Sequence, residues 1–273
     1  MGCSKNYIMY WGVFTVIIVP YVPRKVCTNR DFFSFDSYSK YYDLLYRDKD
    51  YNAEADYISK LLGDVKTVFE MGCGTGKHAK LLTQKGYQMY GIDLSETMLD
   101  QAKLLGIDCS LGDVRTFRAN RMFDAVVSLF HVASYQTTDS DINSYFETAR
   151  LHLNKGGKFI FDVWHKDSVL AQKPEKRVKV LENDEVKVIR HCVPVHHIEK
   201  DVVEVNYTIE VFDKLSDKSE IIKEVHPMRY FSYNDIEKFA TTNNFRIIRS
   251  EAWLTGDVPS ENTWGVCYIC EAL

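Results

Sequence analysis

The sequence predicts an α/β domain built on a mostly parallel β-sheet, with a smaller antiparallel sheet inserted toward its C-terminal end. Between Thr67 and Val163, short apolar runs alternate with segments of helical periodicity. Strands that alternate with helices in this way form a parallel sheet covered by helices on both faces. Residues 165–231 are instead β-branched and alternating, with turn signals between the runs, which is typical of antiparallel strands. An apolar content of 45% is ample for the core of such a domain.

Residues 1–31 differ in character from the rest of the chain. Tyr7 to Val22 is mostly apolar, but this run contains Pro20 and is shorter than the roughly 20 apolar residues that span a bilayer. The start Met1-Gly2-Cys3 is similar to an acylation site, but Asn6 stands where myristoylation requires Ser or Thr. We interpret residues 1–31 as an N-terminal apolar extension of the domain. Membrane contact through residues 7–22 is the alternative.

The domain itself is expected to begin at residue 32. Ala53 to Leu62 has apolar residues at helical spacing, and the aromatic stretch from Tyr41 to Tyr46 precedes it. Such aromatic density at the front of a domain often forms a lid over a bound ligand. Ordinary packing of helices is the alternative interpretation.

A glycine-rich loop then joins a strand to a helix. The apolar run from Thr67 to Phe69 leads through Glu70 into Gly72-Cys73-Gly74-Thr75-Gly76, and Lys77 to Lys85 has a helical pattern. Glycine is required where φ is positive or where a ligand approaches the backbone. The N–H groups that open a helix suit a polar or anionic ligand group.

Two common nucleotide-binding loops do not fit this stretch. A P-loop needs four residues between its glycines and a hydroxyl residue after Lys, but three residues separate Gly72 from Gly76 and His78 follows Lys77. A dinucleotide fingerprint needs a third glycine at the position that Lys77 occupies.

The next elements agree with binding of an adenosine-containing ligand. The apolar run from Tyr87 to Ile92 ends in Asp93, and an acidic residue about 20 residues past the glycines can hold both ribose hydroxyls. Ser95 is the expected N-cap of a helix that ends near Leu105. Ile107 to Leu111 precedes Gly112-Asp113-Val114, and Phe123 to Phe130 is the fourth predicted strand.

The remaining elements complete the prediction. A helix is expected from Asp141 to Leu153, an exit turn over residues 154–157 and a strand from Lys158 to Val163. The inserted antiparallel strands are expected at Val178–Leu181, Val186–Val195, Val202–Phe212 and Ile221–Tyr230. This sheet could cover a substrate pocket, form a dimer face, or both. Its histidines, which we interpret as solvated, are His191, His196, His197 and His226. A helix capped by Ser232 and strands Phe245–Trp253 and Thr263–Ala272 follow.

Composition excludes several classes of function. A net charge of −4 and a pI near 6.1 provide no broad basic surface, so a nucleic-acid substrate is not favoured. Cys267 and Cys270 lie three apart in an apolar strand and should point to opposite faces, which argues against a shared metal ion. We expect all seven cysteines to be reduced thiols in a reducing compartment.

The pattern acidic-x-Gly-x-Gly-x-Gly, with Glu70 leading, resembles that of class I S-adenosylmethionine (SAM) methyltransferases. The resemblance covers the chain from Phe32 to the C-terminus. It implies a Rossmann-like, mostly parallel seven-stranded sheet with an antiparallel last strand. Residues 32–164 would form the SAM-binding core, residues 165–231 the insert, and residues 232–273 the helix and strand pair that complete the core. In the family, the residue at Asp113 hydrogen-bonds the adenine amino group. The implied cofactor-binding residues are Glu70, Gly72, Gly74, Gly76, Asp93, Leu94, Asp113, Val114 and Phe130.

The front of the domain resembles small-molecule N-methyltransferases that act on nucleotide-linked amino sugars. Those enzymes open with a Tyr-Asp-x-x-Tyr segment whose second tyrosine lines the active site, and Tyr46 takes that place here. They carry a histidine after the fourth strand, where a gap-free match places Tyr135, with His131 one helical turn earlier. The resemblance therefore implies His131, Tyr135 and Tyr46 as catalytic candidates. Tyr46, Tyr135, Asp162 and Trp164 are the implied substrate-binding residues.

The predicted function is SAM-dependent transfer of a methyl group to a nitrogen or oxygen of a small polar metabolite, with a sugar or nucleotide sugar as the preferred class. DNA, RNA and protein acceptors are disfavoured because the fourth strand ends in Leu129-Phe130-His131-Val132 rather than an Asn/Asp-Pro-Pro-aromatic motif. An NAD-dependent oxidoreductase and a non-catalytic SAM-binding module are the alternatives. We expect a cytoplasmic protein that needs no metal, binds no nucleic acid and could form a homodimer.

Overall fold

A computed structural model describes residues 39–273 of the chain. The predictions for residues 1–31, including membrane contact through residues 7–22, lie outside the described residues. None of the helices between residues 39 and 273 combines the length and apolar character needed to cross a membrane.

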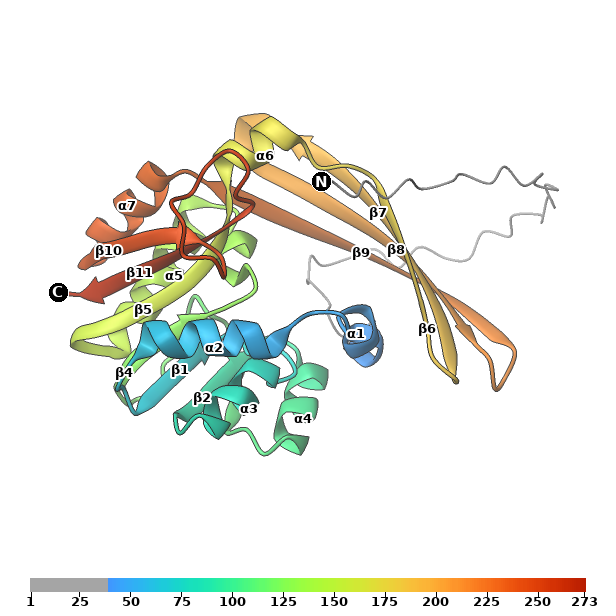
Figure 1. Ribbon diagram of the computed structural model, residues 1–273, viewed down its shortest axis with the longest axis horizontal. Coiled ribbons are helices and arrows are strands. Elements are labelled where there is room, and N and C mark those ends of the chain that lie inside the picture. The colour runs from blue at the N-terminus through green and yellow to red at the C-terminus, as the bar shows by residue number, and fades with distance from the viewer. Residues whose placement is uncertain (1–38) are drawn as a thin grey trace, which may run out of the picture. The chain divides into compact units, whose positions relative to one another are not determined.

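Seven strands form the central sheet, and they confirm the predicted mixture of directions (Figure 1). Five neighbours, in the order β3-β2-β1-β4-β5, run parallel, and β11 pairs antiparallel with both β5 and β10. The strands are β1 (Thr67–Met71), β2 (Gln88–Asp93), β3 (Cys109–Leu111), β4 (Phe123–Ser128), β5 (Leu153–His165), β10 (Phe245–Ala252) and β11 (Gly265–Ala272). The carboxyl ends of the parallel strands therefore meet at one edge, where ligands of such sheets bind.

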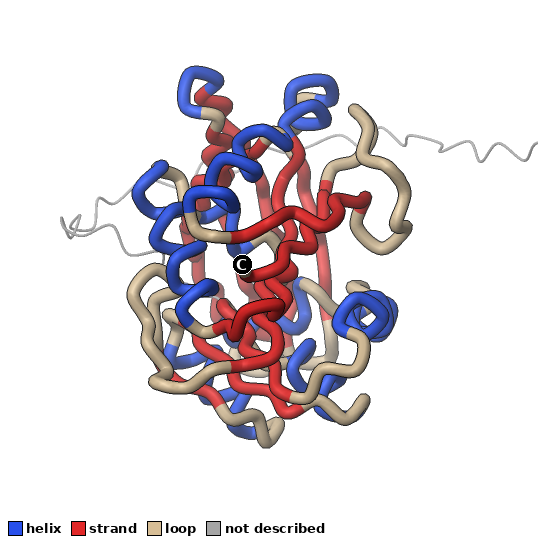
Figure 2. Tube along the Cα trace, turned by 90° about the vertical axis from the view of Figure 1, so that its left-hand side faces the viewer, coloured by secondary structure: helices blue, strands red, loops and turns tan. Residues whose placement is uncertain are grey.

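Helices cover both faces of this sheet (Figure 2). One apolar core contains buried residues of α2 (Tyr51–Leu62), α3 (Lys77–Gln84) and α4 (Glu96–Leu104). The other contains residues of α5 (Asp139–Leu151) and α7 (Tyr233–Thr242). Cys267 lies in the first core and Cys270 in the second, so these cysteines do point to opposite faces of β11.

Local sequence signals set several element boundaries. Ser95 accepts a hydrogen bond from the Met98 N–H and begins α4, and Ser232 forms a capping box with Asp235 at α7. Both caps are as predicted. The start predicted for α5, at Asp141, is wrong by two residues because the Thr138 hydroxyl caps this helix.

Two strand boundaries also differ from the prediction. β4 ends at Ser128 rather than Phe130, because Phe130 and His131 have φ values of 67° and 64°, which a strand does not accommodate. β5 begins at Leu153 rather than Lys158. The turn expected at residues 154–157 lies within β5, next to a register shift in its pairing with β4.

The insert forms the predicted antiparallel sheet. Its strands pair in sequence order and are β6 (Arg177–Glu182), β7 (Val186–His197), β8 (Val202–Asp213) and β9 (Lys218–Phe231). The end of β9 pairs parallel with the end of β5, through Trp164 with Tyr230 and His165 with Phe231, which joins the insert to the central sheet. The sequence does not predict α6 (Lys166–Gln172), because seven residues are too few to display helical periodicity.

One face of the insert is buried and the other is largely exposed. The inner face packs against α1 (Ser39–Leu45) through buried apolar side chains, namely Leu181, Val188, Ile209 and Val211. Several apolar side chains at the opposite parity are exposed, namely Val178, Val180, Val193, Val195, Phe212, Ile221 and Val225. The sheet therefore carries apolar residues on both faces.

Candidate active site

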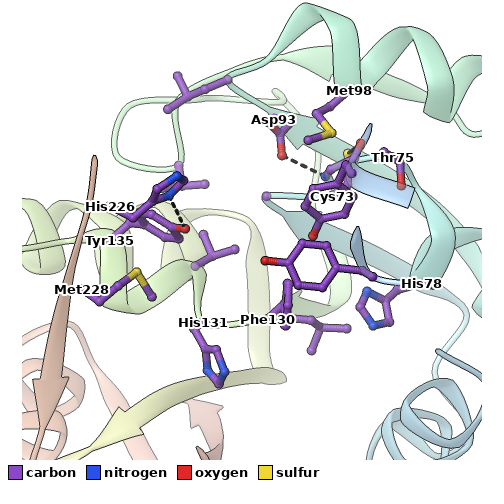
Figure 3. Close-up of a pocket in the computed structure, with 18 of the residues that line it drawn as sticks. Cys73, Thr75, His78, Asp93, Met98, Phe130, His131, Tyr135, His226 and Met228 are labelled. Atoms are coloured by element: carbon purple, nitrogen blue, oxygen red, sulfur yellow. Dashed lines mark hydrogen bonds between the residues drawn. The ribbon is translucent and has the colours of Figure 1, made fainter. Parts of the chain in front are cut away.

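A cavity of about 430 Å³ opens at the carboxyl ends of β1, β2 and β4, with walls from the glycine loop, the segment around α1 and the inner face of the insert. This volume lies in the range of small-molecule sites. Figure 3 shows Asp93, Met98, Cys73 and Thr75 on one side and Tyr135, His226 and Met228 on the other. The predicted site residues that line the cavity are Tyr46, Gly72, Gly74, Asp93, Leu94, Asp113, Val114, Phe130, His131, Tyr135 and Trp164. Glu70, Gly76 and Asp162 do not line it.

The glycine loop uses two of its glycines for different purposes. Gly74 has φ of 51°, and a Cβ there would meet no atom within 4 Å, so its backbone faces open space in the cavity. Gly76 has φ of 76°, and its Cβ would lie 2.9 Å from the Cβ of Ala102. Gly76 therefore permits the close approach of α4 rather than contact with a ligand. Because Gly76 does not line the cavity, its predicted part in cofactor binding stays a prediction.

Asp93 is held in the cavity wall by backbone donors. Its Oδ2 accepts a hydrogen bond of 2.8 Å from the Gly74 N–H, and its Oδ1 accepts one of 3.0 Å from the Ser95 N–H. These contacts fix the carboxylate at the end of β2, beside the glycine loop. Leu94, Met98 and Val114 supply apolar surface next to it.

Asp113 is paired with an arginine at the edge of the cavity. The Arg115 guanidinium donates to both carboxylate oxygens of Asp113 and also bonds Asp141 at 2.9 Å. Burial raises the pKa of Asp113, but the hydrogen bonds from Arg115 more than offset this effect and hold the pKa below its ordinary value. Asp113 is therefore a charged acceptor.

Glu70 lies beneath the glycine loop and is 1% exposed. Burial, and then the charge of Asp93, raise the pKa of Glu70 to about 8, although Lys49 opposes the shift. Its Oε1 lies 3.9 Å from Nδ1 of His78. Glu70 does not line the cavity and lies in the floor beneath the glycine loop, so its predicted part in cofactor binding stays a prediction.

The buried Glu70 leads to a prediction about stability. Between its ordinary pKa of 4.5 and about 8, the folded protein keeps a proton that the unfolded chain has released, so stability falls as pH rises through this range. Glu70→Gln, which stays neutral, should avoid this loss. We expect the variant to be more stable than the wild type by about 2–5 kcal/mol at pH 8.5, and similar to it at pH 4.5. Chemical denaturation without ligand at both pH values measures this difference. An equal difference in unfolding free energy between wild type and Glu70→Gln at both pH values would contradict the prediction. The control is Glu261→Gln, because Glu261 is exposed.

His131 and Asp162 form a pair between β4 and β5. The backbone N–H of His131 lies 3.1 Å from both carboxylate oxygens of Asp162, and its Nδ1 lies 2.6 Å from Oδ2. Asp162 is 1% exposed. Burial raises the pKa of Asp162, but the contacts with His131 outweigh burial and lower it. Asp162 does not line the cavity, and its contacts suit it to hold His131, so its predicted role in substrate binding stays a prediction.

Aromatic residues and an arginine form the wall nearest the insert. The ring of Tyr46 meets that of Phe130 edge-on, with centroids 5.2 Å apart. Arg190 of β7 donates to the Tyr46 hydroxyl at 3.4 Å, and its guanidinium lies 5.0 Å from the ring centroid of Tyr207. The sequence did not predict Arg190 as a site residue, because the alternating pattern of one strand does not show which of its two faces lines the cavity.

His226 is the second residue whose environment differs from our sequence-based interpretation. Instead of being solvated, it is 4% exposed and lines the cavity. Its Nδ1 lies 3.0 Å from the Tyr135 hydroxyl, and its Nε2 lies 2.9 Å from Oε2 of Glu224. A sequence signal was present, because His226 shares its parity along β9 with the apolar Met228 and Tyr230, both of which are buried.

Three other histidines of the insert do not contribute to this cavity. His191, His196 and His197 do not line the cavity. Within residues 39–273, no group of three or more His, Cys, Asp or Glu residues is placed to hold a metal ion.

Comparison with known families identifies the domain. A family described as a methyltransferase domain matches residues 68–157, which run from β1 into the start of β5. Residues 68–157 are a methyltransferase domain. The match agrees with the glycine loop and Asp93, and it decides against the NAD-dependent oxidoreductase.

Relatives of the methyltransferase include enzymes named for amino-sugar substrates. A Streptomyces venezuelae dTDP-3-amino-3,4,6-trideoxy-α-D-glucopyranose N,N-dimethyltransferase is 36% identical over 131 residues, 45% of this chain and 55% of that protein. A Saccharopolyspora spinosa dTDP-4-amino-2,3,4,6-tetradeoxy-D-glucose N,N-dimethyltransferase is 27% identical over 131 residues, 45% of this chain and 53% of that protein. The alignments therefore span about half the length of these relatives.

A solved structure extends the similarity of fold to most of the methyltransferase. The SAM-bound amino pentose methyltransferase of Micromonospora echinaspora superposes with a TM-score of 0.67 at 20% sequence identity. It covers 90% of this chain and 100% of that protein. At this level of identity, the similarity establishes the fold, insert included, and not the substrate.

Proposed function

We propose that this protein transfers a methyl group from SAM to a nitrogen or oxygen of a small polar metabolite, and that the amine of a sugar or nucleotide sugar is the preferred acceptor. One observation carries the proposal. A single cavity joins the open backbone at Gly74 and the carboxylate of Asp93 to a chamber lined by Tyr46, His131 and Tyr135. The names of the two amino-sugar relatives support the acceptor class.

The residues around the glycine loop suit SAM. The absence of a Cβ at Gly74 leaves room for a ligand against the backbone, and Asp93 presents a carboxylate that can accept hydrogen bonds from ribose hydroxyls. Leu94, Met98 and Val114 offer apolar surface for a flat ring. We infer that Asp113 accepts from the adenine amino group, and that Gly72 and Phe130 complete the walls. Glu70 and Gly76 would support this site from below.

SAM supplies a methyl group bound to a positively charged sulfur. The chain must position the acceptor, exclude water and take a proton from it. Because Asp162 is a buried acceptor beside Nδ1 of His131, that nitrogen carries the proton and Nε2 is left as a base. Tyr46, Tyr135 and Trp164 line the chamber in which an acceptor would lie. Catalytic candidates are therefore His131, Tyr135 and Tyr46, with Trp164 in substrate binding.

Cysteine content, net charge and the exposed face of the insert bear on location and partners. We propose that the protein is cytoplasmic, because we expect its seven cysteines to be reduced thiols. We also propose that it does not bind nucleic acid, because its net charge is −4. We also propose a homodimer that buries the outer face of the insert, where apolar residues such as Val180 and Ile221 are exposed. A light-scattering mass of one chain at micromolar concentration would contradict the dimer.

Calorimetric titration followed by a transfer assay tests the function. The full-length chain should bind SAM and S-adenosylhomocysteine but not NAD. It should then methylate members of a panel of amino- and hydroxy-sugars and their dTDP conjugates, detected by mass spectrometry. Binding of SAM without transfer to any acceptor would favour the non-catalytic SAM-binding module. Failure to bind SAM would overturn the proposal.

A further inference from the structure

We propose that Tyr135, His226 and Glu224 form a proton relay that deprotonates the acceptor amine. The inserted sheet supplies two of these residues, and the third follows β4 of the SAM-binding core. The inference deepens the proposed function and depends on it, because it names the groups that receive the proton of a protonated amine.

The geometry connects the three side chains in a line. Tyr135 ends the short helix η1 (Val132–Tyr135), lines the cavity, and has its hydroxyl 3.0 Å from Nδ1 of His226 (Figure 3). On the far side of the ring, Nε2 lies 2.9 Å from Oε2 of Glu224. His226 and Glu224 are 4% and 9% exposed. The three side chains therefore lead from the cavity along the buried face of β9.

The donors and acceptors can be assigned from this network. An ionised carboxylate only accepts hydrogen bonds, so Nε2 of His226 carries a proton toward Glu224. Nδ1 is then an acceptor, and the Tyr135 hydroxyl donates to it. A phenol oxygen can accept a proton while its hydroxyl donates to another group. The direction of the relay follows: a proton can enter at Tyr135 and reach His226.

The chemistry requires such an acceptor. An aliphatic amine has a pKa of about 8 to 10, so at neutral pH most of it is an ammonium ion without a nucleophilic lone pair. In the relay, one ammonium N–H bond breaks and its proton joins the Tyr135 oxygen. The original hydroxyl proton of Tyr135 passes to Nδ1 of His226. The amine becomes neutral with its lone pair free, Tyr135 is unchanged, and His226 becomes an imidazolium ion beside the Glu224 carboxylate.

The surroundings determine the role of each member. Burial, followed by the charge of nearby groups, raises the pKa of Tyr135 well above its ordinary value, so Tyr135 stays a neutral phenol that conducts the proton. His226 is the member that can accept a proton, because an imidazole ring binds a second proton at the nitrogen that is an acceptor in its neutral form. The carboxylate of Glu224 lies 2.9 Å from Nε2 and can pair with the imidazolium ion that the transfer produces. From β8, the ring centroid of Tyr207 lies 5.2 Å from that of His226, and the guanidinium of Arg190 of β7 lies 5.0 Å from the Tyr207 centroid.

The relay is separate from the His131–Asp162 pair. Both histidines line the cavity, but His131 comes from the end of β4 and His226 from the insert. Substitution can therefore distinguish their contributions. A proton acceptor contributes typically 10²- to 10⁴-fold to a rate.

The test uses the full-length chain, SAM and dTDP-3-amino-3,4,6-trideoxy-α-D-glucopyranose as the acceptor probe. Turnover is measured from pH 6.5 to 9.5, and SAM affinity by calorimetry. At pH 7, His226→Asn and Tyr135→Phe should each lower kcat by about 10²-fold or more, and Glu224→Gln by about tenfold. SAM affinity should change less than about threefold. The loss should shrink as pH rises past the pKa of the free amine, because the amine then arrives neutral.

His196→Asn is the matched control. His196 also bonds a tyrosine hydroxyl in the insert, that of Tyr230 at 2.9 Å, but it does not line the cavity. Its turnover should equal that of the wild type. Two results would overturn the relay while leaving the proposed function intact. One is wild-type turnover in His226→Asn, and the other is a loss of equal size at every pH with a lowered melting temperature. A wild-type chain inactive on every amino sugar of the panel would overturn the proposed amine chemistry, and the relay with it.

Discussion

Asp93→Ala is expected to weaken SAM binding by about 10²-fold or more. The carboxylate stands at the end of β2 and is held by the N–H groups of Gly74 and Ser95, so it faces the cavity in a fixed position. A hydrogen bond to a charged group contributes about 1.5–3 kcal/mol, and the ribose of SAM offers two hydroxyl donors. The substitution also removes the acceptor of the Gly74 N–H. Calorimetric titration with SAM measures the effect.

Two further variants make this measurement specific. Asp93→Asn keeps an oxygen that can accept from Gly74 but loses the charge, so its affinity should fall between those of the wild type and Asp93→Ala. Asp100→Ala removes an exposed carboxylate of α4 that pairs with Lys103, and it should bind SAM as the wild type does. Unchanged affinity in Asp93→Ala would contradict the assignment of the ribose site to the end of β2.

Asp162→Asn is expected to lower turnover by about 10²-fold while leaving SAM affinity within about threefold of the wild type. One buried carboxylate accepts the backbone N–H of His131 and also lies 2.6 Å from its Nδ1. An amide keeps one oxygen acceptor, but it carries no charge and puts an N–H donor in place of the second carboxylate oxygen. His131 would lose the negative charge beside its ring and one of the two oxygens that lie 3.1 Å from its backbone N–H.

The control for this variant is Asp167→Asn. Asp167 also neighbours a histidine, with its carboxylate 3.8 Å from Nε2 of His165, but its side chain is 68% exposed. Steady-state kinetics with the amino-sugar probe, and a thermal melt of each variant, separate lost catalysis from lost folding. Wild-type turnover in a folded Asp162→Asn protein would show that His131 does not need this carboxylate, and would remove it from the catalytic proposal.

Local sequence patterns predict the parallel core and the glycine-loop side of the cavity. The signals are local, because a strand, a glycine loop and a helix are contiguous over residues 67–85, and Asp93 ends the next strand. Parallel neighbours bring such strand ends to one edge whatever the rest of the chain does. The caps Ser95 and Ser232 were predictable for the same reason, since a side chain there bonds a backbone group three residues away.

Only the tertiary structure decided which side chains of the insert reach the cavity. The Tyr135–His226 contact joins residues 91 apart and the Arg190–Tyr46 contact residues 144 apart, so no local pattern encodes either. Alternation along β9 is only a partial signal. His226 shares its parity with the buried Met228 and Tyr230, but apolar Val225 stands at the opposite parity and is exposed, so apolar character alone does not identify the inner face. Glu70 and Asp162, which the sequence predicted as site residues, are buried and lie behind the cavity wall. Their neighbours on adjacent strands set those positions, because a side chain's depth depends on what packs over it.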